Sequence, residues 1–379
     1  MIVSYARIQR VSLPLVRGFQ TSSHSKRHLE HLIVSLHDDA GNVGWGEIAS
    51  ASHPYFSPET TDTCWEIATA ELIPALLGKE WSTPQEAINV WDKIRGNYFA
   101  KSGVEMAIWD LYARSKGVSL AGALGGVREE VVAGVSLGIE PTVEQLLRQV
   151  QTQLDYGYRR IKLKIAPGWD IEPVAAVRER FGDILLHVDA NGVYSESSED
   201  LEALHSLDRL ALTMIEQPFA AANFLAHARL QAAINTPVCL DESIETIFDL
   251  ETAIELEALQ VLNIKVSRMG GLSAAISAHD LCMAHGIPVW CGGMHEFGVG
   301  RAANVALSSL PGFVMPSDVS ASEKYYHQDI VTQPITASGG RVRVPTAPGL
   351  GYEVDVAFLE ANTSQSETFA ARAAAGLVP

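Results

Sequence analysis

Five charged residues stand where successive apolar segments end in the second half of the chain. Each follows the one before it by 24 to 27 residues, in the order Lys164, Asp189, Glu216, Asp241 and Lys265. This interval is about the length of one strand and one helix. An acid after a strand often caps the next helix, but five charged residues in five consecutive units are not explained by capping. Side chains at the carboxyl ends of parallel barrel strands share one mouth, so we expect one catalytic site.

Three of the five are carboxylates from adjacent strands, which would repel one another unless a cation lay among them. No His or Cys stands at these strand ends, and an oxygen-only donor set suits Mg²⁺ rather than Zn²⁺. Asp241 and its neighbour Glu242 compete for the third position, because strand alternation turns only one of them inward easily. We choose Asp241, beside Asp189 and Glu216, and expect Glu242 and Asn191 to support the site.

The lysines would flank this metal on two different strands. Lys162 and Lys164 belong to the segment Ile161-Lys162-Leu163-Lys164-Ile165, and Lys265 follows Ile264. A lysine beside a cation and a second lysine has its ammonium form disfavoured, which favours its use as a general base. The alternative is that these lysines merely pair with the acids. The arrangement predicts abstraction of a proton from carbon α to a carboxylate, with the metal stabilising the resulting enediolate.

Short apolar strands that alternate with amphipathic helices would position these residues, from about residue 131 onward. Helices are indicated by starts such as Pro141-Thr142-Val143-Glu144 and Ser197-Ser198-Glu199-Asp200, and by Gly157 and Gly286 after helix ends. The predicted strands are Val131–Leu137, Arg160–Ile165, Ile184–Val188, Thr213–Glu216, Val238–Leu240, Val261–Lys265, Ile287–Trp290 and Phe313–Met315.

Eight parallel strands with seven intervening helices predict an α/β fold, a modified TIM barrel of the (β/α)7β type. A doubly wound open sheet uses the same alternation and is the alternative. It calls for a glycine-rich turn after its first strand, whereas Leu137-Gly138-Ile139 offers a single glycine. The barrel is therefore favoured.

The N-terminal part has a different pattern, that of antiparallel strands followed by helices. Apolar segments on both sides of Asp38-Asp39-Ala40-Gly41-Asn42 indicate a hairpin, and Thr83-Pro84 indicates a helix start. We predict an α+β capping domain over residues 1–125 and the barrel over residues 126–330. The turn-rich segment 331–379 is too short for a domain, and we expect it to pack back on the cap.

Composition excludes several classes of partner. The 379 residues include 28 Lys and Arg against 45 Asp and Glu, a formal net charge of −17, which argues against binding to nucleic acid or anionic lipid. No segment approaches the ~18 apolar residues of a membrane span. Four cysteines without CxxC spacing favour free buried thiols in a reducing compartment, so we expect a cytoplasmic protein; they are Cys64, Cys239, Cys282 and Cys291.

With these residues placed, the chain resembles the enolase superfamily, muconate-lactonizing subgroup, and most closely its o-succinylbenzoate synthase / N-acylamino acid racemase family. The matching motifs include Lys162-Leu-Lys164-Ile-Ala-Pro-Gly-Trp-Asp170, Val188-Asp189-Ala-Asn191, Ile215-Glu216-Gln-Pro218, Cys239-Leu-Asp241-Glu242-Ser243, Asn263-Ile-Lys265, Trp290-Cys-Gly-Gly-Met294 and Gly300-Arg-Ala-Ala-Asn304. The resemblance implies that Mg²⁺ binds the three carboxylates, with Mn²⁺ or another divalent cation able to substitute, and that the protein forms a homo-oligomer.

The resemblance also implies roles for individual residues. In a synthase reaction Lys164 would remove the α-proton and then act as the acid, while Lys265 stabilises the enediolate; in racemisation each lysine would serve one face. Ser136 would donate to the substrate carboxylate and Lys162 would support it. Arg268 matches an arginine of the racemase-capable branch.

Substrate contacts are expected from two loops of the cap, residues 18–23 and 52–56. Phe19 and Tyr55 would close over an apolar side chain of the substrate. On the barrel side, Asn191, Gly293, Met294 and His295 complete the predicted substrate site.

One departure from the family pattern bears on the substrate. Met294 is followed by His295 and later Phe297, where the family usually has an aliphatic residue, then Glu and Thr or Ser. His295 could contact the distal carboxylate of a succinyl group or be an incidental replacement. Substrate identity is therefore less firmly predicted than the metal site.

The expected substrate is a small-molecule carboxylate, and the expected activity is o-succinylbenzoate synthesis, N-succinylamino acid racemisation or both. A dedicated N-acylamino acid racemase and a cycloisomerase are alternatives within the subgroup. A dipeptide epimerase is another, although residues 292–295 lack the Asp-x-Asp of such enzymes. An inactive barrel acting as a binding protein is the alternative of another class, and the complete set of acids and lysines argues against it.

Overall fold

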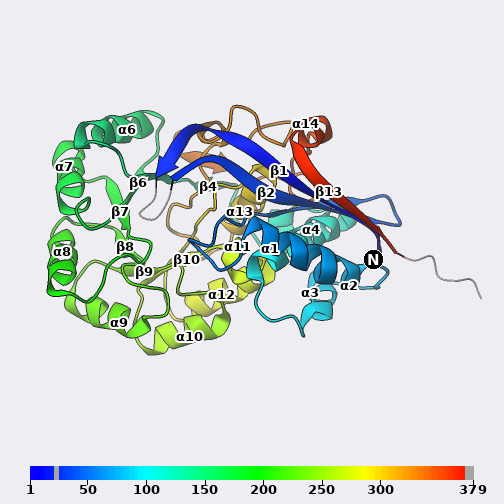
Figure 1. Ribbon diagram of the computed structural model, residues 1–379, viewed down its shortest axis with the longest axis horizontal. Helices are drawn as coiled ribbons and strands as arrows, with labels where there is room; N and C mark the ends of the chain where they lie inside the picture. Colours follow the sequence, from blue (N-terminus) through cyan, green and yellow to red (C-terminus); the bar gives the residue numbers. More distant parts are fainter. Residues whose placement is uncertain (21–24, 372–379) are drawn as a thin grey trace, which may run out of the picture.

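Two sheets, one antiparallel and one parallel, organise the chain (Figure 1). The computed structural model describes residues 1–20 and 25–371, so Thr21, Ser22 and Ser23 of the predicted loop 18–23 lie outside the described residues. Within these ranges no helix is long and apolar enough to cross a membrane. The four cysteines are buried and free.

The antiparallel sheet has the strand order β13-β1-β2-β3 and contains the hairpin expected at residues 38–42. Its last strand in the chain comes from the C-terminal segment and pairs with β1. The boundaries proposed at residues 125 and 330 stay predictions. The four strands are β1 (Val3–Gln20), β2 (Ser25–Asp38), β3 (Val43–Ile48) and β13 (Thr363–Ala370).

Helices follow β1, β2 and β3, as predicted, and the longest of them, α4, packs against β2 and β3. Thr83 caps the helix that begins at Pro84, because its side chain accepts a hydrogen bond from the backbone N–H of Glu86. The helices are α1 (Thr61–Ile67), α2 (Ile73–Leu76), α3 (Pro84–Ile88), α4 (Tyr98–Lys116) and α5 (Leu120–Leu124), with a short π-helical segment at Ala68–Leu72 and a 3₁₀ turn at Asn89–Trp91.

The second sheet is parallel and curled, and its strands lie in sequence order. This order has no reversal, so the doubly wound alternative with its topological switch point is excluded. The α/β prediction is confirmed. The strands are β5 (Val135–Leu137), β6 (Arg160–Lys164), β7 (Leu185–Asp189), β8 (Met214–Glu216), β9 (Val238–Leu240), β10 (Val261–Ile264) and β11 (Val289–Cys291).

Helices connect these parallel strands and cover the outside of the sheet (Figure 1). Thr142 and Ser197 cap two of them as their sequence predicted, each accepting a hydrogen bond from a backbone N–H of the first turn. The helices are α6 (Val143–Asp155), α7 (Ile171–Phe181), α8 (Ser198–Asp208), α9 (Phe224–Ala233), α10 (Ile247–Glu255), α11 (Val266–Met269), α12 (Leu272–Ala284) and α13 (Gly298–Leu307). The short α14 (Val356–Ala361) lies near the C-terminus.

The structure differs from the prediction at the first and last barrel strands. The segment expected as one strand, Val131–Leu137, forms β4 (Glu130–Val132) and β5, because β4 pairs antiparallel with β12 (Arg341–Arg343) instead of continuing into the barrel. The predicted strand Phe313–Met315 is reduced to bridges: Phe313 pairs with Val289, and Ser317 pairs with Ala133. These two bridges connect the two ends of the parallel sheet.

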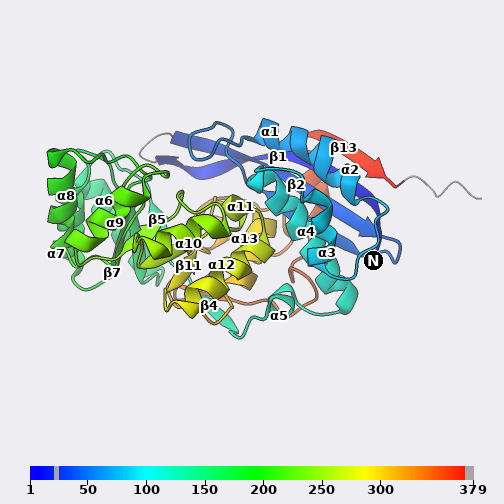
Figure 2. The ribbon, with the colours of Figure 1, turned by 90° about the horizontal axis from the view of Figure 1, so that it is seen from below.

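The β1–β2 hairpin extends from the cap over the barrel mouth (Figures 1 and 2). Two backbone hydrogen bonds fix it there: the N–H of Val16 donates to the carbonyl of Tyr325 at 2.9 Å, and the N–H of Ile139 donates to the carbonyl of Gln20 at 3.0 Å. The hairpin is thereby held above the carboxyl ends of the barrel strands.

β3 packs closely on α4 within the cap, and a buried carboxylate at the end of β3 links the cap to the barrel. A Cβ added to Gly46 would lie 1.9 Å from the carbonyl oxygen of Gly103 on α4. The next residue, Glu47, is fully buried and accepts from the backbone N–H groups of Phe297 and Gly300 at 2.8 and 2.7 Å, at the start of α13. Glu47 therefore anchors the cap to a helix N-terminus of the barrel.

We predict that Glu47→Ala lowers the free energy of unfolding by about 3 kcal/mol, because two buried N–H groups lose their acceptor. Glu66→Ala on the exposed face of α1 is the control with the same change of side chain and charge. Thermal and denaturant unfolding, followed by circular dichroism, would measure both. Equal unfolding midpoints for the two variants would contradict this anchoring role.

Candidate active site

A cavity of about 250 Å³ lies between the β1–β2 hairpin and the carboxyl ends of the barrel strands. Eight of the predicted catalytic and substrate-contact residues line it: Phe19, Tyr55, Lys164, Asn191, Lys265, Gly293, Met294 and His295. Lys26, Phe56 and Glu242 also contribute to its wall. The structure therefore brings together most of the residues that were predicted from separate parts of the sequence.

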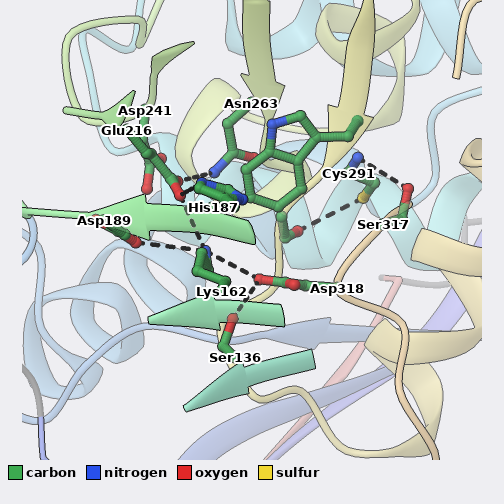
Figure 3. A network of polar contacts seen from close by, with 12 residues as sticks. Ser136, Lys162, His187, Asp189, Glu216, Asp241, Asn263, Cys291, Ser317 and Asp318 are labelled. Atoms are coloured by element: carbon green, nitrogen blue, oxygen red, sulfur yellow. Dashed lines mark hydrogen bonds and ion pairs between the residues drawn. The ribbon is translucent and has the colours of Figure 1, made fainter. Parts of the chain in front are cut away.

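The three predicted metal ligands lie beside this cavity and are completely buried (Figure 3). Asp189 ends β7 and Glu216 ends β8, and the two are direct neighbours in the register of the sheet. Asp241 follows β9 directly. The charged residues that recur once per strand-helix unit in the sequence therefore lie on neighbouring strands around the mouth of the barrel.

Each of these carboxylates is paired with a cation from another strand or the turn after it. Lys164 Nζ lies 2.5 Å from Asp189 Oδ2, and Lys265 Nζ lies 2.7 Å from Asp241 Oδ2. Lys162 Nζ lies 3.1 Å from Glu216 Oε2. This pairing compensates the cost of burying the carboxylate charges.

Lys162 is the most enclosed of the three lysines. Its Nζ lies within 3.3 Å of Asp189, Glu216 and Asp318 oxygens, and 4.7 Å from the ring centroid of Trp290. Burial alone would lower the pKa of Lys162, but the three carboxylates outweigh it and hold that pKa well above its usual range. Figure 3 shows Lys162 among Asp189, Glu216 and Asp318, where it is a fixed positive charge.

The pKa values of the other groups follow the same balance of burial and charge. Burial would raise the pKa of Asp189, but Lys164 and Lys162 lower it well below its usual range. Burial, then Asp241 and Asp189, raise the pKa of Glu242 to about 8. Burial would lower the pKa of Lys265, but Asp241 and Glu242 raise it. For Lys162 and Lys265 this direction is opposite to the one expected from the sequence, which assumed a cation among the carboxylates, because here the carboxylates themselves stabilise the ammonium form.

Three predicted substrate contacts lie outside the cavity wall, and one of them is Lys162, described above. Arg268 is buried and donates to Asp241 Oδ1 and to the carbonyls of Ile244 and Asn263. Ser136 Oγ donates to Asp318 Oδ2 at 3.1 Å. Arg268 is therefore not a surface residue, and its substrate-binding role and that of Ser136 stay predictions.

Ser136 instead lines a second cavity, of about 720 Å³, on the other side of Phe19. Phe19 lines both cavities. The rings of Phe19, His295 and Tyr325 are in contact, with centroids 4.6 Å apart for Phe19 and His295 and 4.8 Å apart for His295 and Tyr325. His295 lines the first cavity, Tyr325 lines the second and Phe19 lines both, so these three rings lie between the two cavities.

The cavity wall contains strained backbone. Asn191, Gln217 and His295 have φ values of 49°, 40° and 65°, in the left-handed region that residues other than glycine rarely adopt. Such strain is characteristic of positions that the surrounding structure holds for function.

The three carboxylates fit Mg²⁺ in their chemistry. Across residues 1–20 and 25–371, no three His, Cys, Asp or Glu side chains already converge as a metal-binding group. The carboxylate oxygens of Asp189, Glu216 and Asp241 form an oxygen-only donor set at the ends of neighbouring strands, which is the kind of set that Mg²⁺ prefers. After the larger effect of burial, repulsion by Asp189 raises the pKa of Glu216, and Lys162 opposes this rise.

Sequence reasoning missed several residues of this region. Asp318 follows the predicted strand Phe313–Met315 and could have been found by the same rule as the other strand-end acids. Phe56 lies within the predicted loop 52–56, but its contact with Lys265, whose Nζ lies 4.2 Å from the ring centroid, was not predicted. Lys26 gave no local signal, because one lysine in a hairpin strand is usually exposed.

Two family models match most of the chain. The N-terminal domain of the mandelate racemase / muconate lactonizing enzyme family matches residues 5–125, and the enolase C-terminal domain-like family matches residues 145–358. The chain belongs to the mandelate racemase / muconate lactonizing enzyme family. The resemblance seen in the sequence motifs is confirmed.

Relatives of this family member cover nearly its whole length. An o-succinylbenzoate synthase from Geobacillus kaustophilus is 43% identical over 97% of each chain. An N-succinylamino acid racemase from Amycolatopsis sp is 48% identical over 93% of this chain and 95% of the relative. A solved enolase-superfamily structure from Listeria innocua is 38% identical, covers 98% of this chain and 100% of that one, and has a TM-score of 0.94.

We predict that Lys162→Met lowers the free energy of unfolding by about 3 to 5 kcal/mol, because the buried Asp189 and Glu216 and the partly buried Asp318 lose a shared cation. Lys79→Met, at an exposed position, should change it by less than about 0.5 kcal/mol. Denaturant unfolding would compare the two variants. A midpoint unchanged in Lys162→Met would mean that the carboxylates do not depend on this cation.

Proposed function

We propose that the protein is a Mg²⁺-dependent enzyme that removes the proton α to a carboxylate, acting as an o-succinylbenzoate synthase with N-succinylamino acid racemase activity. The observation that carries the proposal is the pair Lys164 and Lys265, which reach one cavity from β6 and from the end of β10, next to three buried carboxylates. Relatives with each of these two names are 41% to 48% identical to the chain over nearly full length, which supports both activities.

We further propose that Asp189, Glu216 and Asp241 hold the Mg²⁺. When bound, the cation would stabilise the negative charge that develops on the substrate carboxylate as the proton leaves. Mn²⁺ or another divalent cation of similar ligand preference could take its place.

The protein's own residues would perform the proton transfers. Lys164, as the neutral amine, would take the α-proton from one side of the substrate and become the ammonium, and Asn191 Oδ1, which accepts from its Nζ at 2.8 Å, would orient the amino group. Lys265 would act from the other side, stabilising the intermediate in the synthase reaction and exchanging roles with Lys164 in racemisation. In the synthase reaction Lys164 would return the proton to the departing hydroxide. Phe19 and Phe56 would exclude water from this step.

A dedicated N-acylamino acid racemase is the second candidate. It is favoured by the 48% identity to the Amycolatopsis racemase. An epimerase is less well supported, since the L-Ala-D/L-Glu epimerase relative is only 27% identical. Cytoplasmic location and homo-oligomerisation are part of the proposal; the four buried free cysteines support a reducing compartment.

Hydrogen exchange tests the proposal directly. With Mg²⁺ in D₂O, we expect N-succinyl amino acids of either hand to lose their α-hydrogen to solvent deuterium, with racemisation detected by polarimetry and exchange by NMR. Dehydration to o-succinylbenzoate would be followed by absorbance. Folded protein that binds Mg²⁺ and yet shows neither exchange nor dehydration would refute the proposed function.

Lys164→Ala and Lys265→Ala should each lower kcat by about 10²- to 10⁴-fold in both reactions, with a much smaller effect on KM, because the lost group acts in the transition state. Lys93→Ala, at an exposed position, is the matched control and should keep full activity. Steady-state kinetics would measure the three variants. Turnover close to wild type in either active-site variant would rule out the two-lysine mechanism.

Asp189→Asn should weaken Mg²⁺ binding ~10-fold or more, because a buried anionic ligand is replaced by a neutral one. Asp183→Asn makes the same change at an exposed position just before β7 and should leave the affinity unaltered. Isothermal titration calorimetry with MgCl₂ would measure both dissociation constants. If the two variants bound Mg²⁺ equally well, the ion would have to be held elsewhere.

A further inference from the structure

Lys26 is a third lysine in the wall of the active-site cavity, and it comes from the cap. It stands on β2 opposite Phe19 of β1, near the tip of the hairpin, and is half-buried. Lys164 and Lys265 in the same cavity are paired with buried carboxylates. Among the residues that the structure describes, no carboxylate lies within ion-pair distance of Lys26.

The surroundings of Lys26 make this unpaired charge costly. Burial, and then the positive charges of Lys164 and Lys265, lower the pKa of Lys26 to about 8, while Glu296 opposes them. Glu296 is itself engaged by the backbone N–H of Met294 at 2.9 Å. A cation placed in this way is stabilised when an anion from outside enters the cavity.

The remaining carboxylate in the described cavity wall does not supply that anion. Glu242 Oε1 accepts from Asn191 Nδ2 at 2.9 Å, on the barrel side of the cavity. Three lysines thus line the cavity, and two of them, Lys164 and Lys265, form ion pairs with Asp189 and Asp241 of the barrel. The third, Lys26, can pair with an anionic group of a ligand.

His295 provides a second polar group on the same wall. Burial, followed by Lys26 and Lys324, lowers the pKa of His295 well below its usual range, so its ring is neutral. Its Nδ1 is buried and has no hydrogen-bond partner within the described residues. A neutral imidazole can donate one hydrogen bond, so His295 can assist an anion without adding a charge.

We propose that Lys26, assisted by His295, binds a second carboxylate of the substrate, at the far end of its acyl chain, and so selects dianionic N-acyl amino acids over monoanionic ones. This inference rests on the proposed function, in which the α-carbon lies between Lys164 and Lys265 and the first carboxylate lies at the Mg²⁺. Lys26 lines the same cavity of about 250 Å³ as these two lysines, so the acyl chain of a small substrate bound in this way can extend toward Lys26.

Paired substrates test the proposal with the charge as the single difference. N-succinyl-phenylalanine ends in a carboxylate, and N-succinamoyl-phenylalanine replaces that carboxylate with an amide of nearly the same shape. We expect wild-type protein with Mg²⁺ to prefer the succinyl compound in kcat/KM, and Lys26→Gln to lose about tenfold of this preference. Lys26→Arg should retain most of it, because the positive charge remains.

Arg27→Gln is the matched control, because it removes the same charge from the next residue of β2, where strand alternation turns the side chain to the other face. It should leave the preference between the two compounds unchanged. Activity of Lys26→Gln on the uncharged compound would show that its catalytic residues are intact. A preference in Lys26→Gln equal to that of wild type would overturn the proposal.

Equilibrium binding separates this inference from the proposed function. Isothermal titration calorimetry with the same two compounds in MgCl₂ gives their dissociation constants whether or not they react. If wild type bound the succinyl compound more tightly and Lys26→Gln did not, the role of Lys26 would stand even without turnover. Equal dissociation constants for the two compounds in wild type would refute it.

Discussion

Burial of charge is tolerated only where each charge has a partner, and this constraint governs the interior of the barrel mouth. Lys164 and Asp189 are direct neighbours in the sheet register, and so are Asp189 and Glu216. A shift of one strand by one residue would turn these side chains to the helix-covered side and leave their partners unpaired. The charges needed for chemistry therefore also specify how the parallel strands align, and the fold and the site cannot vary independently.

Much of this architecture could be predicted from local sequence patterns. Apolar segments that end in a charged residue located β6 to β10, because strand ends in a barrel recur with a fixed period. Thr142 and Ser197 marked helix starts, since capping depends only on residues within one turn. Of the eight predicted site residues that line one cavity, Lys164 and Lys265 follow from the strand-end period, whereas cap residues such as Phe19 follow from the family resemblance. Their roles, the metal and the domain boundaries remain proposals.

Other features depend on partners distant in sequence, and no local pattern reveals them. The segment Val131–Leu137 reads as one strand, but its first part pairs with β12, more than two hundred residues later. The predicted strand at Phe313–Met315 forms only bridges. Lys26 was missed because its importance comes from the barrel beneath it and not from its neighbours in β2. Prediction failed where tertiary contacts outweighed local preference.

The seating of the cap hairpin has a consequence for how this protein can diverge. The bonds from Val16 to Tyr325 and from Ile139 to Gln20 join backbone groups, which every amino acid except proline can supply equally well. Side chains between them, such as Phe19, are therefore free to change without unseating the hairpin. New substrate preferences could arise here by single substitutions at little cost in stability, while the barrel mouth, where three lysines pair with buried carboxylates, stays the same.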